Sequence, residues 1–337
     1  MSSLHLDQIS NPWFFVVLFL VASILMVWRL ESMNEKGLEG TVLGTLVMPY
    51  CSGLGNLIFA FLLAKKSDSG GEVMINCLVN NVTNLTLLLG LPALIWGMNL
   101  VATKKPAKNS AKGKKGGGDN GGNKTSRINR LSLLLTLLAV LFFTGALWAL
   151  ASDGKIDGKD ALVLIGLFLF WQTFQVFDVM KNNVQQSKSL SWMLLVDVAL
   201  LLLGAYGIYY STNWLVNWLT HIKTGFVSAK NLGLLSGWLM VLPNALLALY
   251  YGWTKRPEVT YTSQVGDGHI CIPLCIGVFA LYQPLVLPTF FKTGMTILFA
   301  AALVHFFSIA LLGRLPRIVG ALLVAAYGYF LYQGIFP

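Results

Sequence analysis

Long apolar runs separated by short polar stretches dominate the pattern of this sequence. A transmembrane helix needs about 20 predominantly apolar residues, and ten runs approach or exceed that length. Their ranges are 13–29, 40–63, 72–97, 131–150, 160–179, 190–210, 232–252, 260–282, 285–311 and 316–335. The pattern predicts an all-α polytopic membrane protein of about ten transmembrane helices. No positive region precedes the first run, so we expect 13–28 to be a retained span rather than a secretory signal.

Helix-breaking residues lie inside several of these runs. They are Pro49, Pro92, Pro243, Gly266 and Pro273. In lipid, such breaks are tolerated only where the freed backbone groups face protein or a water-filled cavity. The interruptions therefore indicate where a binding site lies.

The two halves of the chain contain weakly similar sequence segments. The segment TLVMPY at 45–50 parallels LMVLPN at 239–244, and NCLVNNVTNLTLLLG at 76–90 parallels SQVGDGHICIPLCIG at 263–277. Five spans separate the matching segments, so the halves have opposite orientations in the membrane. We expect one inverted repeat over 1–180 and a second over 190–337. Interrupted helices in corresponding positions of inverted repeats indicate the central site of a secondary transporter.

Composition and charge narrow the class of protein. Hydrophobic residues make up 55% of the 337 residues and charged residues 11%, which excludes a soluble globule. Most of the net charge of +10 comes from 103–130, a Gly- and Lys-rich stretch with nine basic residues and one acid, Asp119. We expect this loop to be irregular and cytoplasmic, which puts both termini outside a plasma or inner membrane. The loop sets topology, with contact between Lys104–Arg130 and anionic lipid as the alternative. No nucleic-acid partner is expected, because the excess charge lies in one flexible segment.

The repeated segments resemble the alpha repeats of the cation/calcium exchanger superfamily. The matching positions are Pro49, Asn76, Asn81, Asn84 and Gly90 in the first half, and Pro243, Gly266 and Gly277 in the second. The resemblance implies an alternating-access transporter whose first and sixth spans move against a fixed core. It also shows departures. The family's acidic ligand after each Pro is Tyr50 in one half and Asn244 in the other, and Cys271 stands at the last ligand position of the second half.

The candidate ion- or substrate-binding residues follow from the resemblance and from helical spacing. They are Tyr50, Asn80, Asn81, Asn84, Asn244, Asp267 and Cys271. Asn76, Asn80 and Asn84 share one helix face, as do Asp267, Cys271 and Cys275. Asp267 is then the one central carboxylate, which suits Na⁺ or a proton better than Ca²⁺, since Ca²⁺ takes six to eight oxygens. We therefore expect a secondary-active cation transporter with no cofactor beyond a bound Na⁺ or other cation.

Two other functional hypotheses remain open. One is a transport-inactive scaffold or regulator that kept the fold. The other is a carrier of a soft metal or of a neutral or anionic solute, because Cys51, Cys77, Cys271 and Cys275 all lie in the repeat regions. No nucleotide loop, nucleophile elbow or acid–base pair is present, so no enzyme activity is expected. We expect Asp197, in the sixth span, to pack helices or to act in gating, and His305, in the ninth span, to pack helices, rather than to bind the ion.

Overall fold

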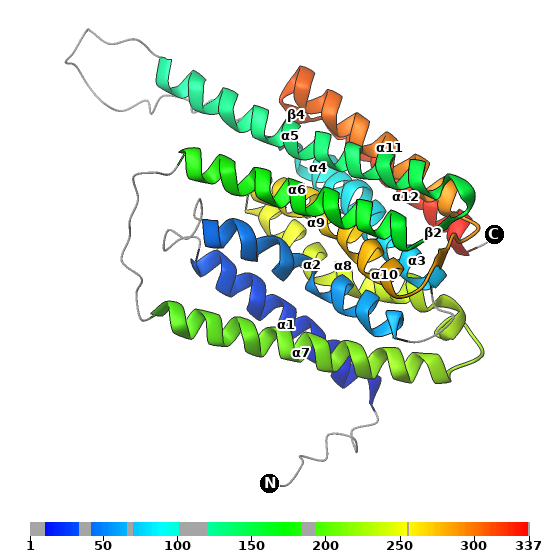
Figure 1. Ribbon diagram of the computed structural model, residues 1–337. Coiled ribbons are helices and arrows are strands. Elements are labelled where there is room, and N and C mark those ends of the chain that lie inside the picture. Colours follow the sequence, from blue (N-terminus) through cyan, green and yellow to red (C-terminus); the bar gives the residue numbers. More distant parts are fainter. Residues whose placement is uncertain are drawn as a thin grey trace.

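A computed structural model describes residues 11–33, 42–65, 70–100, 120–182, 193–254 and 256–335. In the first half the helices are α1 (Pro12–Met33), α2 (Val42–Ala64), α3 (Gly70–Thr83), α4 (Leu89–Trp96), α5 (Asn120–Leu150) and α6 (Gly158–Asn182). In the second half they are α7 (Met193–His221), α8 (Leu232–Trp253), α9 (Pro257–Ile270), α10 (Ile276–Tyr282), α11 (Phe291–Phe307) and α12 (Arg317–Ile335). Three π-helical segments, η3 (Asn84–Leu88), η6 (Cys271–Cys275) and η7 (Ser308–Leu312), interrupt or extend them. Because η3 joins α3 to α4 and η6 joins α9 to α10, the described residues make ten helical passes (Figure 1).

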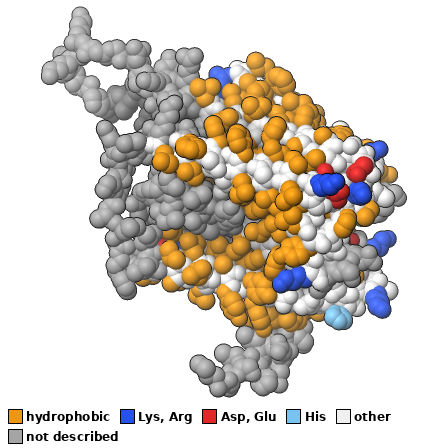
Figure 2. Space-filling view, in the orientation of Figure 1, with side chains coloured by type: hydrophobic (Ala, Val, Ile, Leu, Met, Phe, Trp, Pro, Cys, Tyr) orange, Lys and Arg blue, Asp and Glu red, His pale blue; other side chains and the backbone are white. Residues whose placement is uncertain are grey.

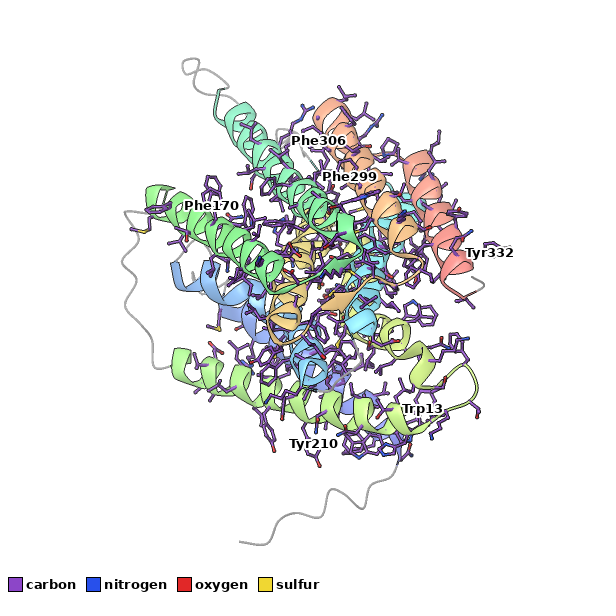
Figure 3. The ribbon with its side chains drawn as sticks, turned by 45° about the vertical axis from the view of Figure 1, so that its right-hand side comes forward. Trp13, Phe170, Tyr210, Phe299, Phe306 and Tyr332 are labelled. Atoms are coloured by element: carbon purple, nitrogen blue, oxygen red, sulfur yellow. The ribbon has the colours of Figure 1, made fainter. Side chains whose placement is uncertain are left out.

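The passes have the character of membrane spans. Eight of the described segments are long and apolar enough to cross a bilayer, and α2 and α7 supply the other two passes. Figure 2 shows hydrophobic side chains across the visible face, with charged ones gathered toward one end. In Figure 3 the aromatic side chains of Trp13, Phe170 and Tyr332 point away from the bundle, and all three are exposed. An apolar outer face is what a bilayer requires, so the molecule is an integral multi-pass membrane protein.

The two interrupted passes occupy the centre. In each of them, Gly70–Trp96 and Val259–Tyr282, 78% of the span is buried, against 17% for the peripheral Arg317–Ile335. The packing follows the repeat. α4 lies on α12 as α10 lies on α6, and α3 lies on α8 as α9 lies on α2. Two inverted five-helix repeats are therefore intertwined rather than set side by side.

Two short antiparallel ladders join the halves. β1 (Met98–Asn99) pairs with β4 (Arg314–Leu315), and β2 (Lys155–Ile156) pairs with β3 (Leu285–Val286). Each ladder links a loop of the first repeat to a loop of the second. In the repeat, β1 corresponds to β3 and β2 to β4, so the ladders obey the same pseudo-two-fold relation as the helices.

α1 and α7 form a closely packed pair along one side of the molecule (Figure 1). Phe15 stacks on Trp214 with ring centroids 3.9 Å apart. At Gly204 the backbones approach so closely that an added Cβ would lie 2.4 Å from the Met26 side chain. The guanidinium of Arg29 lies 3.5 Å from the carboxylate of Asp197. The pair is therefore held by contacts along most of its length.

Three predicted boundaries were wrong. The sixth span extends to His221 instead of ending at 210, because its last turns continue to pack on α1 and α8. The helix of the ninth span, α11, begins at Phe291 rather than at 285, because residues 285–286 form β3 and pair with β2. The stretch 120–130, expected to be irregular, is helical and extends α5 beyond its apolar run. Residues 103–119 of the predicted loop lie outside the described part of the chain.

Candidate ion-binding site

The two central passes are both broken, and the breaks lie at corresponding positions of the two repeats. Of the five predicted interruptions, Pro273 alone lies in a break. The helices α2, α4, α8 and α9 continue without a break through the other four, which are Pro49, Pro92, Pro243 and Gly266. η3 begins at Asn84 and η6 begins at Cys271, which are repeat counterparts. Single turns of π-helix inside α-helices are frequently found at functional sites. Pro273 lies inside η6 and has no N–H to donate, which accounts for part of the break there.

A histidine satisfies a carbonyl at the break in the first half. His305 of α11 has its Nε2 2.7 Å from the carbonyl oxygen of Leu85, within η3. The carbonyl can only accept, so Nε2 carries the proton in this bond. A buried carbonyl left without a donor costs about 1–3 kcal/mol, and Leu85 is buried. This bond is consistent with the expected packing role of His305.

Two side-chain pairs join the central passes across the pseudo-two-fold axis. Asn80 donates from Nδ2 to Cys271 Sγ at 3.2 Å, and Asn84 donates from Nδ2 to Asp267 Oδ2 at 3.1 Å. Each residue of one pair is the repeat counterpart of a residue in the other. All four side chains are buried. The predicted polar faces of the two central passes therefore face each other at the centre of the fold.

The helix α8 adds a third element to this centre. Asn244 follows Pro243, which lies inside α8 and removes a backbone donor there. Nδ2 of Asn244 donates to Oδ2 of Asp267, the same oxygen that accepts from Asn84. Gln264 of α9 donates from Nε2 to the backbone carbonyl of Asn244 at 3.4 Å. Two amide donors thus orient one buried carboxylate, and hydrogen bonds to a charged acceptor are the stronger kind.

Several amide oxygens on α2, α3, η3 and α9 accept no hydrogen bond from any described residue. They belong to Asn56, Asn76, Asn80, Asn84 and Gln264, all buried. Buried polar atoms without a partner are rare and require an explanation such as an ion or an ordered water. Amide and carboxylate oxygens are the ligands that hard cations take. The arrangement is chemically suited to a small cation.

A small cavity lies beside Asn244. It measures about 20 Å³, enough for about one water-sized particle, and its polar lining is Ser23, Asn56 and Asn244. Asn56 of α2 was not among the predicted site residues. The signal was the sequence GLGN at 53–56, in which the two glycines let α2 approach its neighbours closely. An added Cβ at Gly55 would lie 2.5 Å from the sulfur of Met240.

The polar face of α3 continues from the centre toward one end of the molecule. Asn76 donates from Nδ2 to Ser236 Oγ of α8 at 3.0 Å. One turn earlier, Glu72 Oε2 accepts a hydrogen bond from the backbone N–H of Gly233, at the start of α8. A carboxylate at a helix N-terminus is stabilised by the free N–H groups and the helix dipole. Glu72 therefore holds the start of α8 against α3 at the end of this polar face.

The other predicted residues lie differently. Asn81 donates to the backbone carbonyl of Cys77 at 2.7 Å and packs against Gly268, on the neighbouring face of α3. Tyr50 belongs to α2, but its side chain, like that of Cys51, lies outside what the structure describes. Asp197 pairs with Arg29 of α1, as expected of a residue that packs helices.

The three cysteines whose side chains are described, Cys77, Cys271 and Cys275, are reduced and buried. Within the described ranges, no three His, Cys, Asp or Glu side chains are grouped to hold a metal ion. This arrangement gives the soft-metal hypothesis no ligand cluster in this part of the chain.

Comparison with known proteins identifies the fold and the family. Chains of the sodium-calcium exchanger NCX_Mj are structurally similar. One, soaked with 2.5 mM Na⁺ and 10 mM Sr²⁺, has a TM-score of 0.65 at 18% identity over 94% of this chain and 95% of that one. Another, soaked with zero Na⁺ and Ca²⁺, has a TM-score of 0.62 at 18% identity over 96% and 98% of the two chains.

Similarity in sequence identifies the family through one of two comparisons. A search of curated protein sequences gave no significant match. The sequence model of the family described as "Sodium/calcium exchanger protein" matches residues 12–177 and 196–336, which together span most of the chain. The chain therefore belongs to the sodium/calcium exchanger family and is a cation transporter of the exchanger type.

Proposed function

We propose that the protein is a secondary-active transporter that moves a monovalent cation, Na⁺ or a proton, by alternating access. The ion is held between α3–η3 and α9–η6 by Asp267 with Asn80, Asn84 and Asn244. The observation that carries this proposal is the set of buried amide oxygens, without hydrogen-bond donors among the described residues, around one carboxylate. Tyr50, Asn81 and Cys271 complete the proposed set.

The charge of the site supports a monovalent ion. Asp267 and Asp197 are the fully buried carboxylates among the described residues, and Asp197 pairs with Arg29. One carboxylate neutralises one positive charge. A bound Ca²⁺ would leave a net positive charge in a low-dielectric interior, where an uncompensated charge costs several kcal/mol. Amide oxygens alone do not offset that cost.

The arrangement of the helices supports alternating access around a fixed core. The strand ladders join the loops of α3–α6 to those of α9–α12, whereas α1 and α7 pack on each other and reach the core through α2 and α8. The α1–α7 pair is therefore the part that moves, and the repeats 1–180 and 190–337 supply one member each.

We also assign the membrane orientation from charge. The basic segment Lys104–Arg130 is cytoplasmic, near anionic lipid headgroups, and both termini are outside in a plasma or inner membrane. Positive charge near span ends sets this orientation. Arg130 supports a position at the membrane boundary, because it donates to the carbonyls of Ile309 and Ala310 at the π-helical end of the α11 pass.

The test is ion flux in proteoliposomes that contain the purified full chain. We expect ²²Na⁺ uptake driven by an opposing Na⁺ or proton gradient, and no ⁴⁵Ca²⁺ uptake. Flux of Zn²⁺ or Cu⁺ without Na⁺ would replace the proposal with a soft-metal carrier. Flux of ⁴⁵Ca²⁺ would overturn the argument from charge. Absence of flux under every gradient, with a correctly folded and oriented protein, would leave the scaffold.

A further inference from the structure

The small cavity beside Asn244 lies where α1, α2, α7 and α8 meet. Its polar lining comes from three helices, with Ser23 on α1, Asn56 on α2 and Asn244 on α8, and apolar side chains such as Phe19 and Met240 close the wall. Its volume of about 20 Å³ suffices for one water molecule, which needs about 10–15 Å³. Ser23 therefore lies one small molecule away from the residue that orients Asp267.

Each of the three polar side chains presents one atom to this cavity. Nδ2 of Asn244 is bonded to Asp267, which leaves its Oδ1 for the cavity. Oδ1 of Asn56 is sealed from any water-sized particle, which leaves its Nδ2. Ser23 Oγ, Asn56 Nδ2 and Asn244 Oδ1 bond no other described residue, yet all three are accessible.

These three atoms match the bonding of one water molecule. An amide nitrogen only donates, an amide oxygen only accepts, and a hydroxyl does either. A water can therefore accept from Asn56, donate to Asn244 and bond Ser23, which gives the usual number of about three hydrogen bonds. A cation matches poorly, because no carboxylate among the described residues lines the cavity and the Asn56 amide group points its hydrogens inward.

The same bonds determine which way the Asn244 amide faces. An ionised carboxylate only accepts, so Nδ2 must face Asp267, and Oδ1 then faces the cavity. A hard cation at Asp267 takes oxygen ligands, so Asn244 must turn its amide over in order to bind one. The orientation in this structure is therefore that of the ion-free site, and a bond from the water to Oδ1 exists only in this orientation.

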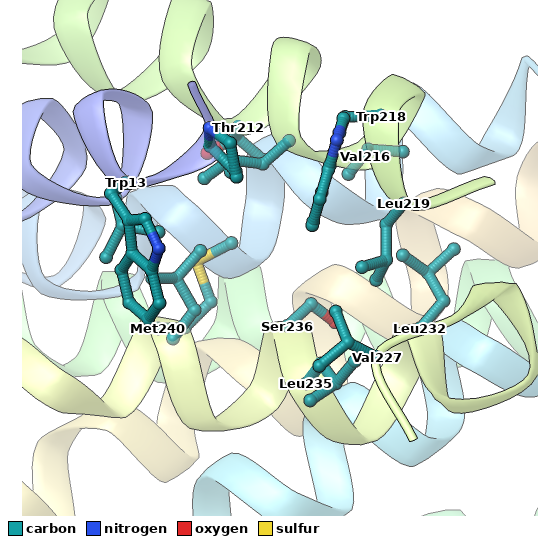
Figure 4. Close-up of a pocket in the computed structure, with 14 residues that line it drawn as sticks. Trp13, Thr212, Val216, Trp218, Leu219, Val227, Leu232, Leu235, Ser236 and Met240 are labelled. Carbon is teal, nitrogen blue, oxygen red and sulfur yellow. The ribbon is translucent and has the colours of Figure 1, made fainter. Parts of the chain in front are cut away.

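Ser23 belongs to the α1–α7 pair, which packs incompletely on α8. Met240 of α8 lines the small cavity and also a larger, mainly apolar one of about 490 Å³ between the pair and α8 (Figure 4). Trp218 of α7 lies across this larger cavity from Leu235 of α8. Side chains that line a cavity lack packing partners on one side. A shift of the pair against α8 therefore breaks few contacts.

We propose that a water molecule held by Ser23, Asn56 and Asn244 keeps the Asn244 amide in its ion-free orientation, and that Ser23 is a positioning residue that couples the place of α1 to cation binding at Asp267. This inference rests on the proposed function. When the α1–α7 pair shifts, Ser23 leaves the water, and Asn244 turns its Oδ1 toward the cation. A site that must first break a stabilising bond has a weaker apparent affinity for its ligand.

The direction of the change in affinity tests the role of Ser23. Ser23→Ala removes one bond that stabilises the ion-free orientation. We therefore expect the Kd for ²²Na⁺, measured by equilibrium binding to the purified full chain in nanodiscs, to fall about twofold to tenfold. Ser132→Ala, at an exposed position of α5, is the matched control and should leave the Kd unchanged. A cation ligand or a merely structural serine would raise the Kd when removed, so an unchanged or raised Kd in Ser23→Ala overturns the proposal.

A second variant tests whether the bonds share one water. Asn56→Leu has a similar size and removes the donor to the same water, so we expect a similar fall in Kd. The double variant with Ser23→Ala should bind little tighter than either single variant, because residues that act through one partner are not additive. Fully independent effects would contradict a shared water. Thermal unfolding of each variant checks that it is folded.

A high-resolution structure of the Na⁺-free protein tests the water without any assumption about transport. We expect one water within hydrogen-bond distance of Ser23 Oγ, Asn56 Nδ2 and Asn244 Oδ1. A cation in the cavity, or a cavity without a water, overturns the inference. If the wild type binds no Na⁺, the proposed Na⁺ transport fails, and the Na⁺-free structure still decides whether a water holds Asn244.

Discussion

The amide nitrogen of Asn84, in the first repeat, donates to a carboxylate oxygen of Asp267, in the second, at a distance of 3.1 Å. This bond joins the two broken helices at the centre of the molecule.

Replacing Asp267 with Asn removes the charge and keeps the shape. Because the proposed cation then loses its counter-charge in a buried site, we expect ²²Na⁺ flux to fall at least about 100-fold, which corresponds to about 2.7 kcal/mol. Asp153→Asn, in an exposed turn, is the matched control and should transport normally. Full coupled flux in Asp267→Asn would remove this residue from the mechanism.

Adding a carboxylate should change ion selectivity. In Asn84→Asp, a second acid stands beside Asp267, and two carboxylates neutralise a divalent ion. We expect Ca²⁺ to compete with Na⁺ at least about tenfold more strongly, a gain of about 1.4 kcal/mol. Competition is measured by inhibition of ²²Na⁺ uptake. Asn84→Ala removes the amide without adding charge and should lose Na⁺ flux without gaining Ca²⁺ affinity. Equal Ca²⁺ competition in both variants would contradict the charge argument.

His305→Ala should destabilise the fold through the broken first-half helix. The carbonyl of Leu85 then has lost its donor, and a buried acceptor left without its partner costs about 1–3 kcal/mol. Thermal unfolding in detergent measures the loss. His221→Ala, at the exposed end of α7, is the control and should change stability little. An unchanged unfolding temperature in His305→Ala would show that the π-helical segment does not depend on this bond.

The start of α6 should show a defined pH dependence. Asp157 accepts from the backbone N–H groups of Lys159 and Asp160, and Asp160 accepts in turn from the N–H of Asp157. These backbone bonds lower the pKa of the Asp157 carboxyl from its usual 3.8. A lowered pKa means that the stabilisation is complete above the usual value and is lost as the pH falls through the folded-state pKa.

Asp157→Ala should therefore unfold at a lower temperature than the wild type near neutral pH, and the difference should shrink below about pH 4. Asp157→Asn keeps a capping group and should lie between the two. A difference that persists unchanged into acid would point to packing rather than to the ionised cap.

The sequence predicted the ten helical passes, the family and most of the central pairing. Helical spacing is enough to place Asn80 and Asn84 on one face, and the repeat then sets that face against Asp267 and Cys271. Asn56 could not be found in this way, because its role depends on how closely the glycines of α2 let that helix approach Met240 and Asn244. The π-helical segments also escaped prediction, since their geometry depends on partners such as His305 that lie far away in sequence.

The extension of α7 shows a limit of hydropathy alone. Polar residues such as Asn213 and Asn217 lie in its last turns, beyond the apolar run 190–210. Aromatic packing against α1, as in the Phe15–Trp214 stack, keeps these turns helical. Tertiary contacts between distant segments decided this boundary.

The two central pairs are related by symmetry but not by chemistry, since one contains a carboxylate and the other a thiol. A pseudo-two-fold axis exchanges the inner and outer sides of a membrane protein built from inverted repeats. An ion held by Asp267 therefore lies off that axis, nearer to one side of the membrane than to the other. Release toward the two compartments should require breaking different contacts, so the protein is expected to work as a rectifier, with unequal rates for opposite directions of the same gradient.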